Sequence, residues 1–338
     1  MKKYLISPEK NQYKANLHCH SVLSDGCKTP DELKEMYKSR GYSILSITDH
    51  ERPTEHQRLA DDDFVLLTGY EVYIRPDPKY NLYRDEVHLN LFAKDPYNLS
   101  WICFNPEYSK YAIRDGVVDE IPKVGSERPR EYTVDYLNEF IKTANDAGYL
   151  VAYNHPVWSM LPEAKLLELK GIFSLEISNY SAYLINGLDN YNGALYNALL
   201  SSGDRIFCHG GDDNHNKMPV DHPHCDSFGA FTMIMADELN YSSVITAMES
   251  GEMYSSMGPT ISELSVDNGK KLHLECSEVS RVYVYFSNKC VRYQHANKGE
   301  AITSFECEID KNAPFVRVAI CDKDGNWAST RGYFPDEL

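Results

Sequence analysis

Seven short β-like runs in the first two thirds of the chain constrain its fold more than any other feature. They span residues 13–20, 43–50, 64–71, 86–92, 149–154, 172–177 and 205–210. Helical patterns separate most of these runs, at residues 30–40, 133–147, 163–169 and 194–201. Because strands that alternate with helices are typical of parallel sheets, the pattern predicts a barrel-like α/β domain.

Acidic and histidine side chains mark the ends of these predicted strands. In six of the seven runs they lie on the strand or just beyond its C-terminal end, which is the face that carries the active site in α/β barrels. The side chains concerned are His18, His20, Asp25, His50, Glu71, His88, His155, Asp213 and His215. Six imidazoles and three carboxylates at one end of a barrel suit a multinuclear site for Zn, Mn or Fe.

The first group along the chain shows how such a site would be built. His18 and His20 share one face of a strand, about 7 Å apart, and Asp25 follows beside the flexible Gly26. By itself a His-x-His pair is more often two half-buried polar residues than a metal site. The metal prediction therefore depends on the agreement among the other strand ends.

Composition excludes several classes of protein. The 338-residue chain has a formal net charge of −16, which opposes a nucleic-acid coat because such binding needs Lys and Arg to neutralise phosphates. Its apolar runs are too short to span a membrane, and its first residues lack the apolar stretch of a signal peptide. The nine cysteines contain no Cys-x-x-Cys pair, which favours reduced thiols. These features predict a cytoplasmic protein.

The sequence changes character after about residue 228. A strand at 228–235 and a helix at 242–250 precede alternating runs at 271–276, 281–286, 305–309 and 315–321. Turn signals between the runs are typical of a small antiparallel β-sandwich. We therefore expect a barrel domain over residues 1–257, with a long irregular insertion at about 95–130, and a β-sandwich domain over residues 258–338.

Four ordered motifs resemble those of the PHP (polymerase and histidinol phosphatase) superfamily. They are His18-Cys19-His20 with Ser24-Asp25-Gly26, Ile47-Thr48-Asp49-His50, Asn154-His155-Pro156, and Gly211-Asp212-Asp213-Asn214-His215. Glu71 and Glu86-Val87-His88 match the intervening positions of the family. The resemblance covers residues 13 to about 236, and it implies a distorted (β/α)7 barrel with a trinuclear metal centre.

The resemblance also implies which residues would hold three divalent ions of Zn, Mn or Fe. The first metal would be held by His18, His20, Glu71 and Asp213. Glu71 would bridge to a second metal that is bound by His88 and His155. The third metal would be held by Asp25, His50 and His215. Catalytic roles would fall on Glu71, Asp213 and His215, and the complete ligand set argues against a non-catalytic copy.

Residues beside the predicted ligands have two readings each. Asp49 resembles an acid of the family that orients His18 or His20, although a cap for the following helix fits its position equally well. Asp212 either tunes the site or faces a helix. Glu176 and Asn179 resemble a wall segment of the family, which predicts contact with the substrate.

Basic side chains and loop histidines complete the candidates. Arg52 is predicted to contact a substrate phosphate, with Arg75, Arg84 and Lys217 as further candidates. His222 and His224 are expected to be loop residues near the mouth of the site.

The resemblance implies hydrolysis by a hydroxide that bridges two metals. The leading prediction is a phosphoesterase that acts on a small phosphomonoester or phosphodiester, because three cations suit a phosphate. The alternative is an amide, ester or carbamate hydrolase, since residues 251–259 are similar to the tail of a PHP branch that includes carbaryl-hydrolase-type proteins. Aromatic residues, among them Trp101, Tyr153 and Trp158, also favour that alternative. A third prediction is a non-catalytic, metal-dependent binding module.

Overall fold

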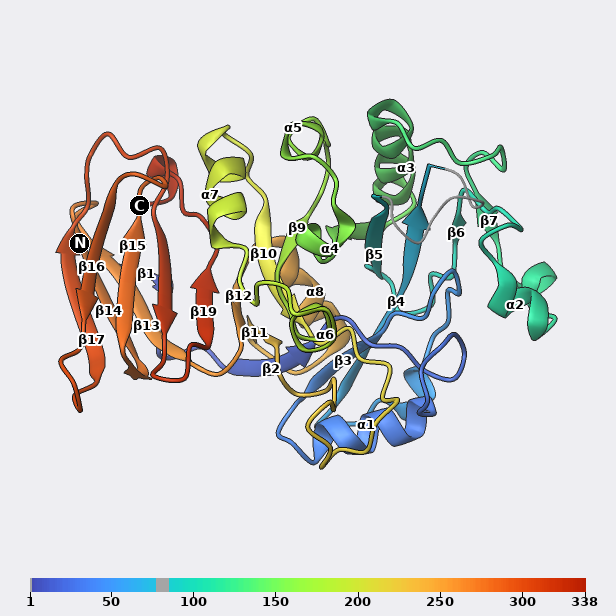
Figure 1. Ribbon diagram of the computed structural model, residues 1–338, viewed down its shortest axis with the longest axis horizontal. Coiled ribbons are helices and arrows are strands. Elements are labelled where there is room, and N and C mark those ends of the chain that lie inside the picture. Colours follow the sequence, from blue (N-terminus) through green and yellow to red (C-terminus); the bar gives the residue numbers. More distant parts are fainter. Residues whose placement is uncertain (1, 77–84) are drawn as a thin grey trace.

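One large mixed sheet runs through most of the molecule (Figure 1). The structure is a computed structural model that describes residues 2–76 and 85–338. Nine strands of the large sheet come from residues 12–256, and each of the seven predicted runs overlaps one of them. They are β2 (Gln12–Asn16), β3 (Ile44–Ile47), β4 (Val65–Ile74), β5 (Val87–Ala93), β8 (Tyr149–Tyr153), β9 (Ser174–Asn179), β10 (Phe207–Gly211), β11 (Phe231–Met235) and β12 (Met253–Ser256).

The directions of these strands differ in part from the prediction. Their order in the sheet is β10-β9-β8-β5-β4-β3-β2-β11-β12. β2, β3 and β4 run parallel to one another, as do β8, β9 and β10. β5 runs antiparallel to both β4 and β8, so the prediction of parallel strands is wrong there. Residues 75–86 join β4 to β5, and a link of this length is at the short limit for the crossover that parallel neighbours need.

The segments that follow β2 and β10 contact each other beyond the C-terminal ends of these two strands. The backbone N–H of Asp213 donates to the carbonyl of His18 over 2.9 Å. The N–H of His20 donates to the carbonyl of Asn214 over 3.0 Å. These bonds bring the segments after β2 and β10 side by side, whereas the distorted (β/α)7 barrel itself stays a prediction.

Helices cover the sheet, and the sequence signals place most of the longer ones. They are α1 (Pro30–Lys38), α2 (Lys110–Arg114), α3 (Val134–Asp146), α4 (Pro156–Ser159), α5 (Glu163–Leu166), α6 (Tyr180–Asn186), α7 (Gly193–Ser201) and α8 (Tyr241–Glu249). At the start of α1, Thr29 accepts from the N–H of Glu32, the Glu32 carboxylate accepts from the N–H of Thr29, and Pro30 takes the first helical position. The short helices α2, α4 and α6 were not predicted, because helices of only one or two turns carry little periodicity.

The C-terminal region contains two layers of strands around one apolar cluster. Its strands are β13 (Ile261–Asp267), β14 (Lys271–Val279), β15 (Arg281–Tyr285), β16 (Val291–His295), β17 (Ile302–Glu308), β18 (Arg317–Cys321) and β19 (Trp327–Thr330). β19, β18, β15 and β16 extend the large sheet beyond β12, whereas β13, β14 and β17 belong to a second sheet. Leu264 and Leu274 of the second sheet and Val282 and Val318 of the large one share a buried cluster. This is the region for which a β-sandwich was predicted.

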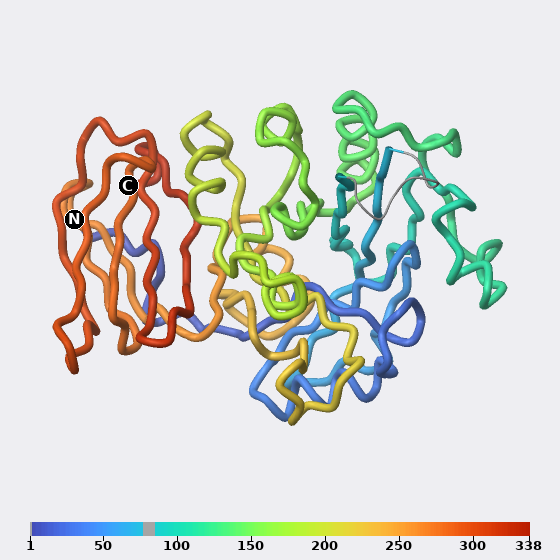
Figure 2. The backbone as a smooth tube through the Cα atoms, viewed as in Figure 1, coloured from blue at the N-terminus to red at the C-terminus, as the bar shows by residue number. Residues whose placement is uncertain are grey.

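The second sheet also includes a strand from the other end of the sequence. β1 (Lys2–Ile6) pairs antiparallel with β13, and β12 pairs with β19, so ladders cross the predicted domain boundary at residues 257 and 258 twice. Both marked chain ends lie at this end of the molecule (Figure 2). Within the described residues, no helix combines the length and apolarity that crossing a bilayer requires.

The insertion at 95–130 is folded rather than irregular throughout. It contains α2 and a pair of two-residue strands, β6 (Trp101–Ile102) and β7 (Lys123–Val124). Trp101 and Ile102 are fully buried in the same apolar cluster as α3. The insertion is therefore part of the core beside β4 and β5.

Candidate metal centre

The predicted ligands lie at one edge of the strand set. His18 and His20 follow β2, His50 follows β3, His155 follows β8, and Asp213 and His215 follow β10; Glu71 lies inside β4. His88 lies at the beginning of β5, yet because β5 is antiparallel its beginning meets the ends of the parallel strands. Tyr73 of β4 is opposite His88 in this ladder. The reversed direction of β5 is thus what brings His88 to the edge.

The structure brings all nine predicted ligands together. Their ligand atoms form four overlapping groups in which all atoms lie within 4.8 Å of one another. The groups are His20, Asp25, His50 and His215; His18, His155 and Asp213; His18, His20 and Glu71; and Glu71, His88 and His155. Because neighbouring groups share His18, His20, His155 or Glu71, the nine side chains form one continuous cluster.

These groups resemble the three ligand sets that the sequence predicts. The set of Glu71, His88 and His155 is reproduced as predicted, and the set of Asp25, His50 and His215 gains His20. Asp213 Oδ1 lies 3.2 Å from His18 Nε2 and 3.1 Å from His20 Nε2, next to the group that contains Glu71.

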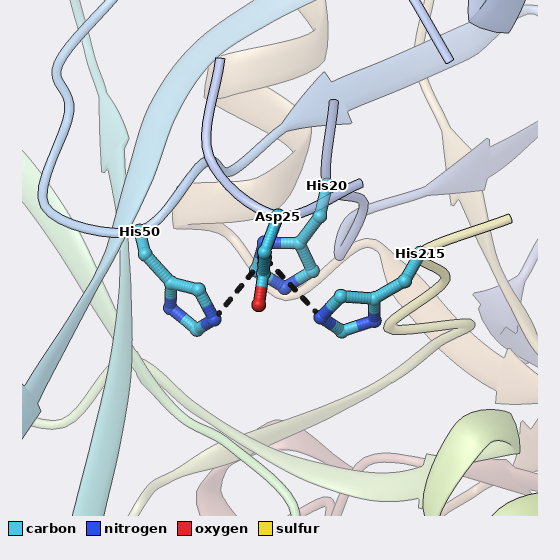
Figure 3. A group of neighbouring side chains, drawn as sticks. All are labelled: His20, Asp25, His50 and His215. Carbon is cyan, nitrogen blue, oxygen red and sulfur yellow. Dashed lines mark ion pairs between the residues drawn. The ribbon is translucent and has the colours of Figure 1, made fainter. Parts of the chain in front are cut away.

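Asp25 lies among three imidazoles on the outer side of the cluster. Its Oδ1 is 3.4 Å from Nε2 of His215, 3.7 Å from Nε2 of His50 and 3.9 Å from Nδ1 of His20. Figure 3 shows the carboxylate between the rings of His50 and His215, which approach it from opposite sides. The loop after β2 thus folds back and brings the Asp25 carboxylate close to His20, which lies at the start of the same loop.

Several polar atoms inside the cluster have no hydrogen-bond partner, which bears on whether the cluster can bind metal ions. His18 Nε2, His20 Nδ1, His50 Nδ1 and Glu71 Oε2 are buried and make no hydrogen bond. Burying such an atom without a partner costs free energy. Nitrogen and carboxylate atoms that converge without hydrogen bonding are the donor set that Zn, Mn and Fe ligate. The residues therefore fit divalent metal ions.

Charge within the cluster shifts the pKa values of its members. Burial alone would lower the pKa of His88, but the carboxylates of Glu71 and Glu86 raise it to about 10. Burial likewise opposes the charge of His215, whose pKa Asp25 and Asp213 raise to about 9. Burial would raise the pKa of Glu71, yet the surrounding imidazoles hold it well below its usual range.

Glu176 and Asn179 support the ligands from behind. Glu176 is fully buried, accepts from His18 Nδ1 over 2.9 Å and accepts from the backbone N–H of His155 over 2.8 Å. Asn179 donates to Glu176 over 2.9 Å and to Asp213 over 3.2 Å. Neither lines the cavity described below, and their hydrogen bonds fix the orientation of predicted ligands, whereas substrate contact stays a prediction.

Two acids next to ligands have structural roles. Asp49 accepts from the N–H and hydroxyl groups of Ser21 and Ser24 over 2.5–3.1 Å, which fixes the turn that carries Asp25. Asp49 thus neither caps a helix nor bonds His18 or His20. Asp212 accepts from the Tyr37 hydroxyl of α1 over 2.7 Å and from three backbone N–H groups of residues 228–230, and burial raises its pKa to about 6. These contacts support the hypothesis that Asp212 faces a helix rather than the hypothesis that it tunes the site.

The basic candidates occupy different places. Arg52 pairs with Asp115 and donates to the carbonyl of Leu23 over 3.3 Å, so its charge is already matched away from the cavity. Substrate contact by Arg52 therefore has no support from its placement. Lys217 lines the cavity, and Arg75 lines a smaller adjoining one. Arg84 lies outside the described residues.

Seven of the nine cluster residues, all except the buried His18 and His20, form the floor of a cavity of about 470 Å³. A volume of this size suits a small molecule. Trp158 lines it, whereas Trp101 and Tyr153, which were also predicted near the site, are buried in the core. His224 lines the cavity as well, in agreement with a loop position near the mouth. The remaining lining includes Glu86, Ser181, Ala182, Ile185, Asn186, Met218 and Asp226.

Sequence reasoning missed a buried ion pair next to the ligands. Both terminal guanidinium nitrogens of Arg130 donate to the carboxylate of Glu51, the residue after His50, and both side chains are fully buried. The N–H of Glu51 donates to the carbonyl of Glu71 over 2.7 Å. Glu51 also accepts from the N–H of Tyr73 over 3.1 Å. An acid directly after a ligand was visible in the sequence, but its partner 79 residues later was not.

Backbone strain accompanies the cluster. Four of the eight described non-glycine residues with positive φ are a ligand or adjoin one: Glu51 at 49°, His155 at 26°, Asp213 at 54° and Asn216 at 57°. Such conformations cost free energy and persist where surrounding contacts enforce them, which is common at functional sites.

Comparisons with known proteins add structural neighbours. No family model and no curated protein matches the sequence. Among solved structures, the chain is similar to a two-domain protein from Bacteroides vulgatus ATCC 8482 that is described as containing a predicted PHP-like metal-dependent phosphoesterase. The identity is 14%, the match covers 97% of this chain and 96% of that one, and the TM-score is 0.44.

Two further structures match a smaller part of the chain. A candidate metal-dependent phosphoesterase from Bifidobacterium adolescentis ATCC 15703 is 18% identical over 63% of this chain and 92% of that one, with a TM-score of 0.39. An amidohydrolase from Chromobacterium violaceum with bound sulfate and no metal is 18% identical over 60% of this chain and 87% of that one, with a TM-score of 0.40. We base the functional proposal on the geometry of the cluster.

Proposed function

We propose that the chain is a metal-dependent hydrolase of the PHP type that cleaves a small phosphomonoester or phosphodiester. The observation that carries the proposal is the single cluster of six imidazoles and three carboxylates, seven of which line one cavity. The cluster would hold three divalent ions in the sets predicted from the sequence, within a distorted (β/α)7 barrel followed by a β-sandwich. The bonds between the segments after β2 and β10 support the closed barrel.

Charge favours a phosphate over an uncharged substrate. Three divalent ions would exceed the charge of the carboxylates of Asp25, Glu71 and Asp213, and Lys217 adds a further cation to the cavity. Divalent ions in such a site polarise the scissile group and lower the pKa of a water molecule. A phosphate dianion gains more from this excess charge than a neutral ester does.

The chain's own residues prepare this site. His18 Nδ1 bonds Glu176, which leaves Nε2 to face the centre of the cluster. Glu71 is fully buried and lies between five imidazoles, so it is the side chain best placed to bridge two ions. Its contacts run to His18, His20, His50, His88 and His155, at distances between 3.0 and 3.4 Å.

Hydrolysis of an amide, ester or carbamate is the second candidate. The indole of Trp158 lines the cavity beside His88 and His155, and an uncharged aryl carbamate would find an aromatic contact there. Such a substrate would gain less from the positive charge of the cluster. We therefore rank it second.

One set of assays separates these functions. The protein is loaded with Mn, Zn or Fe and is given p-nitrophenyl phosphate, bis(p-nitrophenyl) phosphate and p-nitrophenyl methylcarbamate. We expect phosphate ester cleavage that a chelator abolishes and added metal restores. Carbamate turnover without phosphate ester cleavage would overturn the proposal in favour of the second candidate. Retained metal with no turnover of any substrate would instead favour a binding module.

A further inference from the structure

The cavity lining includes four apolar side chains from α4, α6 and the loop after β10, beside the polar Ser181 and Asn186 of α6. The four are Trp158 of α4, Ala182 and Ile185 of α6 and Met218 of the loop after β10. Ile185 is 57% exposed and Met218 is 43% exposed. Large apolar side chains left in water beside a cavity indicate a surface that a ligand covers. We call these four residues the apolar wall.

The apolar wall is fixed to the floor of the cavity by the chain itself. α4 begins directly after His155, and Met218 follows His215 by three residues. The indole of Trp158 lies 4.7 Å from the ring of His155 and 5.0 Å from that of His88. A molecule whose reacting group lies on the floor can therefore place its remaining atoms next to this wall.

Exposed apolar residues are concentrated around the same segments. Among the described residues, six of the eleven large exposed apolar side chains belong to α4, α6, the residues directly after them or the loop after β10. These are Val157, Met160, Tyr183, Ile185, Met218 and Val220. Exposing these apolar side chains to water does not stabilise the fold.

Apart from the predicted ligands, three charged side chains of the cavity have other roles, and Ser181, Asn186 and His224 are its remaining polar lining. Asp226 accepts from the backbone N–H groups of His215, over 2.7 Å, and Asn216, over 3.1 Å, so it holds the ligand loop. Glu86 bonds His88 over 3.0 Å. Lys217 carries a charge that suits the phosphate rather than its organic part.

We propose that the substrate is a phosphoester of an apolar alcohol, either aryl or medium-length alkyl, whose organic part lies against Trp158, Ile185 and Met218. This inference rests on the proposed phosphoesterase function and names the substrate class of that site. The charged end lies on the ligand cluster, and the apolar end replaces water on the wall. Small polar phosphoesters of similar charge lack the second contact.

A series of alkyl phosphates tests the inference with little change in leaving-group chemistry. The metal-loaded protein is given ethyl, butyl, hexyl and octyl phosphate, and KM and kcat are measured for each. We expect KM to fall about two- to fourfold for each added methylene until the cavity is filled, because burial of a methylene favours binding by that factor. The affinity of the matching alkylphosphonates, measured by calorimetry, should rise by the same factor without any turnover.

Variants of the wall locate the effect. Ile185→Asn and Met218→Gln remove apolar surface and should flatten the dependence of KM on chain length, while metal content stays the same. Tyr183→Asn is the matched control, because Tyr183 is 43% exposed on the same helix but does not line the cavity. The control should keep the full chain-length dependence.

The outcomes separate this inference from the proposed function. Equal KM and phosphonate affinity across the series, or an unchanged slope in Ile185→Asn and Met218→Gln, would overturn the apolar wall while hydrolysis of the phosphates stands. Failure to cleave any phosphate while alkyl carbamates show the chain-length dependence would overturn the phosphoester but support the wall. If no phosphate is cleaved and no substrate shows the chain-length dependence, both the proposed function and the apolar wall would be overturned.

Discussion

Glu71 has the largest number of neighbouring imidazoles of any carboxylate in the cluster. Its two oxygens contact five histidines, and Oε2 has no hydrogen-bond partner although it is buried. A carboxylate in this position can neutralise two ions at once. Its charge therefore affects metal binding more than its volume does.

Glu71→Gln should reduce bound metal by about two ions per chain and lower phosphate ester cleavage by at least about 100-fold, because the amide keeps the shape but not the charge. Metal analysis and turnover measure both effects. Glu263→Gln is the control, since Glu263 pairs with Lys2 and lies 4.0 Å from His273 in the second sheet. Full activity in Glu71→Gln would refute the bridging role.

Metal binding should release protons at neutral pH. The pKa values of His88 and His215, about 10 and about 9, lie above 7.5, so both rings are protonated in the metal-free protein. A metal ligates only the neutral imidazole, so loading should release at least about two protons at pH 7.5. His18 adds to this release, because its burial is outweighed by Asp213, Glu176 and Glu71, which hold its pKa well above its ordinary value. Calorimetry in buffers of different ionisation enthalpy measures this number. The release should decline as the pH approaches 10, and a value of zero at pH 7.5 would contradict the prediction.

Glu176 should act on metal affinity and not on substrate binding. Glu176→Gln weakens the acceptor for His18 Nδ1 and should lower metal affinity by about 10- to 100-fold, with KM unchanged at saturating metal. Competition with a chelator measures the affinity. A higher KM with normal metal affinity would instead support the substrate contact that the sequence predicts for Glu176.

At the scale of elements, a buried ion pair connects the insertion to the site. Arg130, at the end of the insertion, bonds Glu51, donates to the carbonyl of Tyr73 over 2.7 Å and lies over the ring of Tyr108 at 4.5 Å. The ring of Tyr73 lies 5.9 Å from His50 and 5.7 Å from His88. The pair thus connects the insertion to two ligands.

Arg130→Met leaves Glu51 buried without its partner and should destabilise the protein by about 3–5 kcal/mol. Because Glu51 adjoins His50, metal should also be lost more readily. Urea unfolding and chelator competition measure the two effects. Arg317→Met is the matched control: Arg317 is fully buried and bonds Asn197, Tyr191 and Ser329 away from the cluster. It should lower stability without weakening metal retention, and an equal loss of metal in both variants would contradict the role of Arg130.

The sequence predicted elements well where local signals determine them. Each run that ends in a ligand contains a strand, because its apolar residues are contiguous and buried. The direction of β5 was not visible, since it depends on which strands become neighbours. Likewise, the nine ligands were recognisable from ordered motifs, whereas the partner of Arg52 and the inward position of Glu176 depend on contacts between residues far apart in sequence.

At the scale of the whole molecule, the sequence does not divide into two consecutive segments that each form one of the two sheets. The large sheet continues from β12 into β19, and the apolar cluster between the sheets includes Met235 and Tyr254 from the strands of the first region. A sequence boundary drawn at residue 257 cannot represent this sharing. We expect the region after residue 258 to be less stable alone than in the whole chain, which thermal unfolding of both forms would measure.

The pairing of β1 with β13 separates two partners by about 260 residues of chain. During synthesis β1 leaves the ribosome long before β13 exists, and at typical rates of about 5–20 residues per second the wait lasts on the order of 10–50 seconds. For that time its edge has no ladder partner, and closing so long a loop delays folding further. The strand exposes Lys2, Lys3 and Tyr4, and the two lysines discourage pairing with a second chain while β1 waits.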